Sequence, residues 1–446
     1  MNTPICDFVR GYAASGISRL HMPGHKGASV LGMEHLDITE IQGADSLYEA
    51  EGIIAESERC ASALFGANTF YSTEGSSQCI RAMLCLALLH ARGQGIARPR
   101  IAAGRNAHKT FLSAAALLDL DVTWLYPDGA ASYLTCAVTA PMLERVFAED
   151  EKPMAVYLTS PDYLGNTVDV AALAEVCHRH GALLLVDNAH GAYLKFLFPS
   201  RHPMDLGADL CCDSAHKTLP VVTGGAYLHI SRSAPADLVG EAKRALAMFG
   251  STSPSYLILQ SLDAANPILA GNYSAELSAL SNRVSALREC LTAHGFVCVG
   301  DEPIKLTLCP KSYGYTGTDL AQILREGGIE CEFADPDYLV LMFTPATTEG
   351  DIARLTDVLL SVSRRAAITE VPPAMRISER VMSVREAAFS PCETIPAAES
   401  VGRILAAATV GCPPAVPIVV SGERIDENAA AQFVYYGIES CVVVKK

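Results

Sequence analysis

The sequence predicts an α/β protein built around a mostly parallel β-sheet. From about residue 50 to residue 265, short apolar runs alternate with longer stretches whose apolar residues recur at helical spacing. This alternation is typical of parallel sheets covered by helices. The chain has 446 residues and half of them are hydrophobic, which is enough for two or three folded units at roughly 150 residues per domain.

The strands of this sheet are expected where apolar runs end in small or charged residues. These runs are Arg100–Ala103, Met154–Thr159, Ala182–Asp187 and Ala208–Cys212. The helices between them are expected at Ser77–Ala91, Thr110–Leu118 and Val170–His180. Gly181 directly follows the last of these helices, where it suits a C-cap.

A second, smaller α+β unit is expected after the alternation loosens at Asp263. Its long first helix, Tyr273–His294, has apolar residues along one face. Two strands and two helices follow, at Ile304–Cys309, around Asp319–Arg325, at Tyr338–Thr344 and near Thr348–Ser363.

A Pro-Pro pair at 372–373 marks a linker into a C-terminal segment. That segment is expected to hold a helix near Ala398–Ala408 and a final strand at Ser440–Lys445. The predicted organisation is an N-terminal segment (1–49), a large domain (50–265), a small domain (266–371) and a C-terminal domain (372–446).

The charge balance excludes several classes of protein. The chain has 34 Lys and Arg against 49 Asp and Glu, a net charge of −15, so broad attraction to nucleic acid or to anionic lipid is not expected. No apolar run approaches the roughly 18 residues of a membrane span, and the N-terminus lacks a signal-peptide pattern. The fifteen cysteines are scattered without a C-x-x-C pair. We therefore expect a cytoplasmic protein with reduced thiols and no metal site.

Two motifs at strand ends carry the chemistry. Asp187, in VDNAH, ends one apolar strand, and Lys217, in CDSAHKTLP, follows the next one. Alone, the first could be a turn or cap residue and the second a solvated surface lysine. Ligand crevices of open α/β sheets lie at the carboxyl ends of strands. An acid that keeps a pyridine nitrogen protonated and an amine that binds an aldehyde together indicate pyridoxal phosphate.

Two further motifs suit the same cofactor. In STEGSSQ, a Gly-Ser-Ser turn runs into a helix, so Ser76 and Ser77 would stand where helix N–H groups attract a phosphate. Serine is also common at helix starts for structural reasons alone. In GRNAHKT, His108 follows a strand and could stack on the pyridine ring, although a lone histidine is more often a satisfied polar residue.

The order of the motifs resembles the ornithine/lysine/arginine decarboxylase family of pyridoxal phosphate enzymes. The ordered blocks include HMPGHKG (21–27), GRNAHKT (104–110), LVDNAHGAYLKF (185–196), SAHKTLPVVTGGAYLH (214–229), STSPSY (251–256) and PPAVPIVVSGE (413–423), and PGHKG and SAHKTLP are specific to the family. The resemblance covers nearly the whole chain. It implies the fold-type-I, aspartate aminotransferase-like fold, with a smaller α+β domain and a C-terminal segment. It also implies the short form of the family, without an N-terminal receiver-like domain.

The resemblance assigns roles to individual residues. Lys217 would bind the cofactor covalently, Asp187 would pair with the ring nitrogen, and His108 and Ala189 would lie on opposite ring faces. The residues implied around the phosphate are Ser76, Ser77, Ser214 and His216. Glu423 matches a family glutamate placed near the distal cationic group of the substrate. The STSPSY block is implied to reach a partner subunit, in a homodimer or larger assembly with the active site at the interface.

Three positions depart from the family pattern. Asn188 stands where the family has Glu in Asp-Glu-Ala-His, Glu74 stands where it has Asn, and Thr223–Gly224 stand in place of Thr-Gln. The expected reaction is decarboxylation of arginine, lysine or ornithine to the amine, with Lys217 or His216 protonating Cα. The alternatives are another pyridoxal phosphate reaction, such as transamination or aldol cleavage, and a regulatory paralogue with reduced catalysis.

Overall fold

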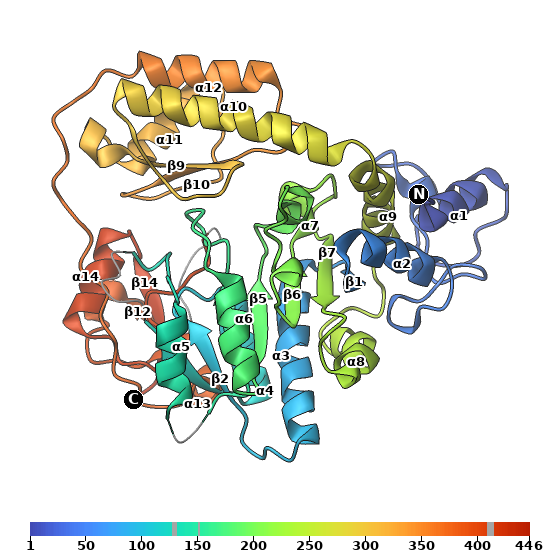
Figure 1. Cartoon of the computed structure of the whole chain (residues 1–446), viewed down its shortest axis with the longest axis horizontal. Helices are drawn as coiled ribbons and strands as arrows, with labels where there is room; N and C mark the ends of the chain where they lie inside the picture. The colour runs from blue at the N-terminus through green and yellow to red at the C-terminus, as the bar shows by residue number, and fades with distance from the viewer. Residues whose placement is uncertain (127–131, 150–151, 408–413) are drawn as a thin grey trace. The chain divides into compact units, whose positions relative to one another are not determined.

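The computed structural model describes residues 1–126, 132–149, 152–407 and 414–446. These residues form two compact units. Unit 1 comprises residues 1–97, 154–156 and 170–275, and unit 2 comprises residues 98–153, 157–169 and 276–446. Figure 1 shows the elements of both units in chain order, from blue to red.

Unit 1 carries most of the strands and helices expected around Asp187 and Lys217. Its α-helices are α1 (Pro4–Ala14), α2 (Ile53–Phe65), α3 (Gly75–Gly93), α6 (Val170–Arg179), α7 (Ala215–Thr218), α8 (Ala236–Ala247) and α9 (Tyr256–Ala270). Its strands are β1 (Asn68–Ser72), β5 (Leu183–Asp187), β6 (Leu210–Asp213) and β7 (Ala226–Ile230). Four short 3-10 helices are η1 (Glu34–Leu36), η2 (Leu47–Glu49), η3 (Ala192–Phe196) and η4 (Pro203–Asp205).

Unit 2 combines part of the central sheet with two smaller sheets. Its α-helices are α4 (Lys109–Leu118), α5 (Ala140–Phe147), α11 (Gly317–Glu326), α12 (Glu349–Ser361), α13 (Val384–Phe389) and α14 (Glu427–Tyr435). Its strands are β2 (Arg100–Gly104), β3 (Asp121–Leu125), β8 (Val297–Val299), β9 (Lys305–Cys309), β10 (Phe333–Ala334), β11 (Leu339–Met342), β12 (Cys392–Pro396), β13 (Leu405–Ala407) and β14 (Ser440–Val444). Two 3-10 helices are η5 (Pro310–Tyr313) and η6 (Ala397–Glu399), while β4 (Ala155–Thr159) and α10 (Tyr273–His294) have residues in both units.

The central sheet has seven strands in the order β1-β7-β6-β5-β4-β2-β3. Strands β5 and β6 are parallel, with Asp187 opposite Cys212, and β2 and β3 are also parallel. Strand β7 runs antiparallel to both β6 and β1. The sheet is therefore mostly parallel, as the sequence predicts, and β7, between β1 and β6, runs opposite to both of its neighbours.

Strand β5 shows why the apolar runs become parallel strands. All five of its residues are buried, and Leu184, Leu185 and Val186 have no exposed surface. A parallel strand covered on both faces needs apolar side chains in both directions rather than an alternating pattern. The charged residue at the end of such a run, Asp187, then lies at the carboxyl end of this central strand.

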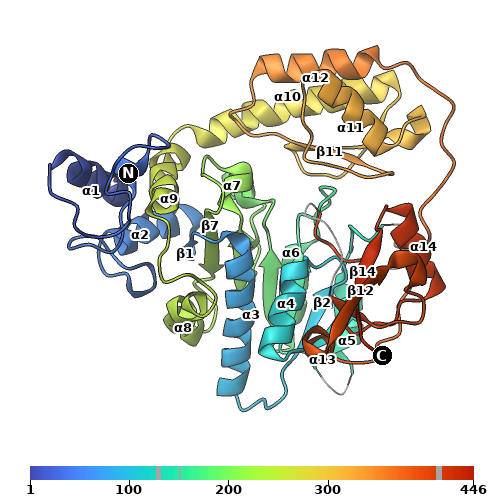
Figure 2. The same ribbon diagram turned by 180° about the vertical axis from the view of Figure 1, so that it is seen from behind.

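Two smaller antiparallel sheets lie in unit 2. The first has the order β10-β11-β9-β8, and α10, α11 and α12 lie over it (Figures 1 and 2). The second has the order β12-β14-β13, with α14 beside it in Figure 2. Apolar residues from this C-terminal sheet, from α14 and from Val416, Ile418 and Val419 share one core with Tyr133 and Phe333.

The structure confirms the long helix Tyr273–His294 and corrects the helix expected near Ala398–Ala408. Only the 3-10 turn Ala397–Glu399 forms there, and Leu405–Ala407 is strand β13, with Leu405 opposite Val443 of β14. Gly402 interrupts the segment with φ of +81°, a backbone conformation that an α-helix does not contain. Residue 408 lies outside the described residues.

Two general findings complete the description of the fold. In the described ranges, each cysteine is a free thiol. In the same part of the chain, we find no helix that combines the length and the apolar character needed to cross a membrane.

Candidate active site

Asp187 is held rigidly at the end of β5. Its side chain is buried, and Oδ1 accepts hydrogen bonds from the Ala189 N–H at 3.2 Å and from the Cys212 thiol at 3.5 Å. Burial, followed by the charge of Asp187, raises the pKa of the Cys212 thiol well above its ordinary value. The thiol therefore keeps its proton and donates a hydrogen bond to Asp187 Oδ1, which helps to orient the carboxylate.

Lys217 lies on the short helix α7, which begins directly after β6. Its Nζ is 2.7 Å from Nε2 of His190, a buried residue of the DNAH motif. A hydrogen bond joins the two nitrogens, so the imidazole sets the position of the amine. The sequence analysis missed His190, although its spacing of three residues from Asp187 was a usable signal.

The hydroxyl groups predicted for the phosphate come together at the start of α3. Ser214 Oγ donates to Ser76 Oγ at 2.7 Å, and Ser77 is the next residue of the same helix. His216 Nδ1 donates to the Gly225 carbonyl at 3.0 Å, which fastens α7 to the strand that follows. The first turn of a long helix has N–H groups without helical partners and a positive dipole end, so this arrangement suits an anion.

Gly224, one of the departures from the family pattern, binds the first turn of α3 through its main chain. Its carbonyl accepts the Gly75 N–H at 2.8 Å, at the start of α3. Its φ is +98°, and a Cβ at this position would lie 3.0 Å from the Thr73 carbonyl oxygen. Glycine is therefore the residue that this local conformation requires.

Glu74, the second departure, is exposed immediately before α3. Its carboxylate accepts a hydrogen bond from the Ser251 N–H, at the beginning of the STSPSY block. Glu74 thus ties this block to the start of α3 within one subunit. The implied reach of the block to a partner subunit stays a prediction.

His108, in unit 2, caps the N-terminus of α4. Its Nδ1 accepts the Thr110 N–H at 3.1 Å and lies 2.9 Å from the Thr110 hydroxyl. A nitrogen that accepts a backbone N–H carries no proton, so the remaining proton of the neutral ring lies on Nε2. The ring orientation is fixed by this cap, while its stacking on the cofactor stays a prediction.

Glu423, also in unit 2, is buried, and both of its carboxylate oxygens accept hydrogen bonds. Its Oε2 accepts from the Val420 N–H at 2.8 Å and from Arg105 Nη2 at 3.4 Å, and its Oε1 accepts from the Tyr126 hydroxyl at 3.4 Å. Arg105 also donates to the carbonyls of Pro417 at 2.8 Å and Ile418 at 2.7 Å. Arg105 and Glu423 together anchor this part of the C-terminal segment, and a contact between Glu423 and the substrate stays a prediction.

Comparison with known proteins identifies the family. Residues 3–294 match the major domain of the Orn/Lys/Arg decarboxylases, and residues 365–440 match their C-terminal domain. The chain belongs to the Orn/Lys/Arg decarboxylase family. This membership confirms the resemblance drawn from the motifs and makes the protein a decarboxylase.

Curated relatives of this Orn/Lys/Arg decarboxylase family member match nearly end to end. The arginine decarboxylase of Bacillus subtilis (strain 168) is 28% identical over 461 residues, covering 96% of this chain and 92% of that protein. The arginine decarboxylase of Halalkalibacterium halodurans is 29% identical over 465 residues, with the same two coverages of 96% and 92%.

Solved lysine decarboxylases share the fold. The Francisella novicida enzyme has a TM-score of 0.80 at 18% identity, with 99% of this chain and 79% of that chain covered. The constitutive Escherichia coli enzyme has a TM-score of 0.78 at 18% identity, with 100% and 82% covered. The fold class predicted from the sequence, the fold-type-I α/β architecture, is thereby confirmed.

Membership of the Orn/Lys/Arg decarboxylase family implies pyridoxal phosphate as the cofactor, and the residues of unit 1 fit it. The hydroxyl pair of Ser76 and Ser214 lies at a helix N-terminus, as a phosphate requires. Asp187 offers a fixed carboxylate at the neighbouring strand end, and Lys217 offers an amine. This donor set matches the phosphate, the ring nitrogen and the aldehyde of the cofactor.

Proposed function

We propose that this enzyme decarboxylates a basic amino acid, arginine, lysine or ornithine, to the corresponding amine and CO₂. The observation that carries the proposal is that Asp187 ends β5 and Lys217 follows β6, the strand next to β5. The chain that holds both residues belongs to the Orn/Lys/Arg decarboxylase family. Relatives named arginine decarboxylase and solved lysine decarboxylases support a substrate with a cationic side chain.

Each candidate site residue has its own proposed role in the reaction. When bound, pyridoxal phosphate supplies a ring that accepts the electron pair left by the departing CO₂. Asp187 would hold a proton on the ring nitrogen, Lys217 would anchor the cofactor, and the hydroxyls of Ser76, Ser77 and Ser214, with His216, would hold the phosphate. Lys217 and His216 are the candidates that deliver a proton to Cα of the product, and His108 and Ala189 would lie on opposite faces of the ring.

A substrate panel tests the proposal directly. Purified holoenzyme is incubated with arginine, lysine, ornithine and neutral amino acids, and CO₂ and amine are measured. Release of both from a basic substrate supports the proposal. Keto acid or aldehyde instead of CO₂ would indicate transamination or aldol cleavage, and bound cofactor without turnover would indicate a regulatory paralogue.

We further infer a cytoplasmic homodimer or larger assembly with the active site at the subunit interface, acting in polyamine biosynthesis. The family resemblance of the STSPSY block supports the interface. Light scattering of the purified holoenzyme checks the assembly. A monomer with full activity would contradict it.

Glu423→Gln is expected to raise KM for the basic substrate about tenfold or more while leaving kcat nearly unchanged. A carboxylate that faces an ammonium or guanidinium group contributes roughly 1.5–3 kcal/mol, and loss of binding common to ground and transition states appears in KM. Steady-state kinetics with the preferred substrate checks this. Glu427→Gln, at the exposed start of α14, is the control. A lower Tm with an unchanged KM would assign Glu423 to anchoring through Arg105 alone.

His108→Asn is expected to weaken cofactor affinity about fivefold, because ring stacking of roughly 1 kcal/mol is lost. Asparagine keeps a side-chain acceptor for the Thr110 N–H and so preserves the cap of α4. Titration of apoprotein with pyridoxal phosphate measures the affinity. An affinity equal to that of the wild type would remove His108 from the cofactor site.

A further inference from the structure

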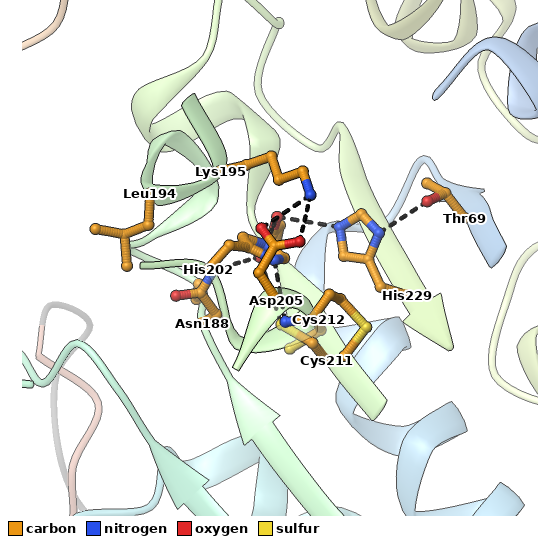
Figure 3. A network of polar contacts seen from close by, with 12 residues as sticks. Thr69, Asn188, Leu194, Lys195, His202, Asp205, Cys211, Cys212 and His229 are labelled. Atoms are coloured by element: carbon orange, nitrogen blue, oxygen red, sulfur yellow. Dashed lines mark hydrogen bonds and ion pairs between the residues drawn. The ribbon is translucent and has the colours of Figure 1, made fainter. Parts of the chain in front are cut away.

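A buried polar network lies at the end of β6, the strand that pairs with β5. The sequence analysis did not anticipate it. At its centre is Asp213, the last residue of β6, with no exposed surface. Its Oδ2 accepts from Nε2 of His202 and from Nε2 of His229, each at 3.0 Å. Its Oδ1 accepts from Asn188 Nδ2 at 2.7 Å. Asn188, His202 and His229, which come from three different segments, are labelled in Figure 3.

The two imidazoles direct their Nε2 atoms at Asp213, and each Nδ1 has a partner of its own. His202 Nδ1 accepts the Met204 N–H at 3.3 Å, and His229 Nδ1 lies 2.9 Å from the Thr69 hydroxyl. Burial lowers the pKa of His229. Burial opposes ionisation of Asp213, but the two histidines outweigh it and hold the pKa of this carboxyl below its ordinary value. Asp213 is therefore a fully buried carboxylate that is held by both imidazoles.

Asn188 connects the Asp213 carboxylate to the carboxylate of Asp187, the residue proposed to bind the cofactor. Its side chain binds Asp213, its N–H donates to the Cys212 carbonyl at 3.0 Å, and the next N–H, of Ala189, binds Asp187. A Cβ at Gly191 would lie 2.0 Å from Asn188 Oδ1, so the glycine leaves room for this amide. The side chain at 188 thus has one defined position, with its nitrogen toward Asp213.

Asn188 is also the position where the family pattern has Glu. A carboxylate at 188 would lie within hydrogen-bond distance of the Asp213 carboxylate, and like charges so close disfavour ionisation of both. The amide avoids this conflict and donates to the acid at 213 instead. The chain therefore has one buried carboxylate in this pair, and it lies on β6.

We propose that Asp213 is a positioning residue for the cofactor site, and that it acts through the amide of Asn188. This inference rests on the proposed function, because the carboxylate that Asp213 positions, through Asn188 and the Ala189 N–H, is the proposed cofactor partner Asp187.

An exchange of the two side chains tests the proposal. In Asn188→Asp/Asp213→Asn, the amide at 213 would accept from the imidazoles through Oδ1 and donate to the carboxylate at 188 through Nδ2. Only the weak hydrogen bond from the Cys211 thiol to Asp213 Oδ1, at 3.7 Å, loses its acceptor. The wild type, both single variants, the double variant and the control Asp205→Asn are prepared. The control removes a carboxylate that binds Lys195, at the surface of the same region. Affinity of apoprotein for pyridoxal phosphate and Tm of the apoprotein are measured for each.

Asn188→Asp and Asp213→Asn are each expected to weaken cofactor affinity about tenfold, within the range for residues that share one network. The double variant is expected to return to within about twofold of the wild type, and Asp205→Asn to keep wild-type affinity. If a single variant does not fold, recovery of folding and cofactor binding in the double variant supports the proposal.

Two results would overturn it. One is a lower Tm in both single variants with unchanged cofactor affinity, which would make the network structural only. The other is a double variant whose loss of cofactor affinity equals the combined losses of the two single variants. A wild type that neither binds pyridoxal phosphate nor decarboxylates would instead refute the proposed function, so the two failures are distinguishable.

Discussion

Lys217→Ala is expected to abolish decarboxylation and to remove covalently bound cofactor from the protein. The Lys217 amine is the group proposed to bind the cofactor aldehyde, and alanine has no nucleophile to replace it. Turnover should fall below detection in the substrate panel. Borohydride treatment of wild-type holoenzyme should fix pyridoxal phosphate on the peptide that contains residue 217, as read by mass spectrometry.

Lys195→Ala is the matched control for this experiment. Lys195 lies in the same unit, and its Nζ binds both carboxylate oxygens of Asp205, at 2.6 and 2.8 Å. The control should keep the covalent cofactor and most of the activity. Cofactor fixed by borohydride in Lys217→Ala, on any other lysine, would show that the assignment of Lys217 is wrong.

Asp187→Asn is expected to keep the cofactor and to lose at least about 100-fold in kcat, as when a preorganised electrostatic group is removed. The substitution is isosteric, and the amide can still accept the Ala189 N–H that Asp187 now accepts. A neutral amide does not hold a proton on the ring nitrogen, so the ring becomes a weaker acceptor of electrons. Single-turnover kinetics of the holoenzyme isolates this effect from binding.

The control for Asp187→Asn is Asp205→Asn, which removes a carboxylate that takes part in a surface ion pair. It should change kcat little. If Asp187→Asn decarboxylated at nearly the wild-type rate, Asp187 would have no role in polarising the cofactor.

Much of the fold was predictable because its signals are local. The apolar runs before Asp187 and Asp213 are buried along their whole length, and burial on both faces leaves a continuous hydrophobic pattern in the sequence. The helix at Tyr273–His294 has the predicted bounds. The segment near Ala398 was mispredicted because its alanines favour a helix, while pairing of β13 with β14 decided the outcome.

The candidate site was predicted in part. Contact between Ser76 and Ser214 joins two motifs that are far apart in the sequence but were both expected at the phosphate. The network around Asp213 could not be predicted, because His202 belongs to no motif, and His229, at the end of the block that begins with SAHKTLP, reaches this residue only through the tertiary fold. Similarly, the VSGE motif does not reveal that Glu423 pairs with Arg105.

The anchor formed by Arg105 has a consequence for sequence divergence. Its guanidinium binds the main-chain oxygens of Pro417 and Ile418 rather than their side chains. Every residue type presents the same carbonyl group, so these two hydrogen bonds do not specify the side chains at 417 and 418, and Ile418 is constrained instead by its place in the core. Arg105 itself is constrained, because lysine lacks the planar fork that donates to two carbonyls and Glu423 together. The anchor therefore restricts the residue type at 105, while packing restricts the residue type at 418.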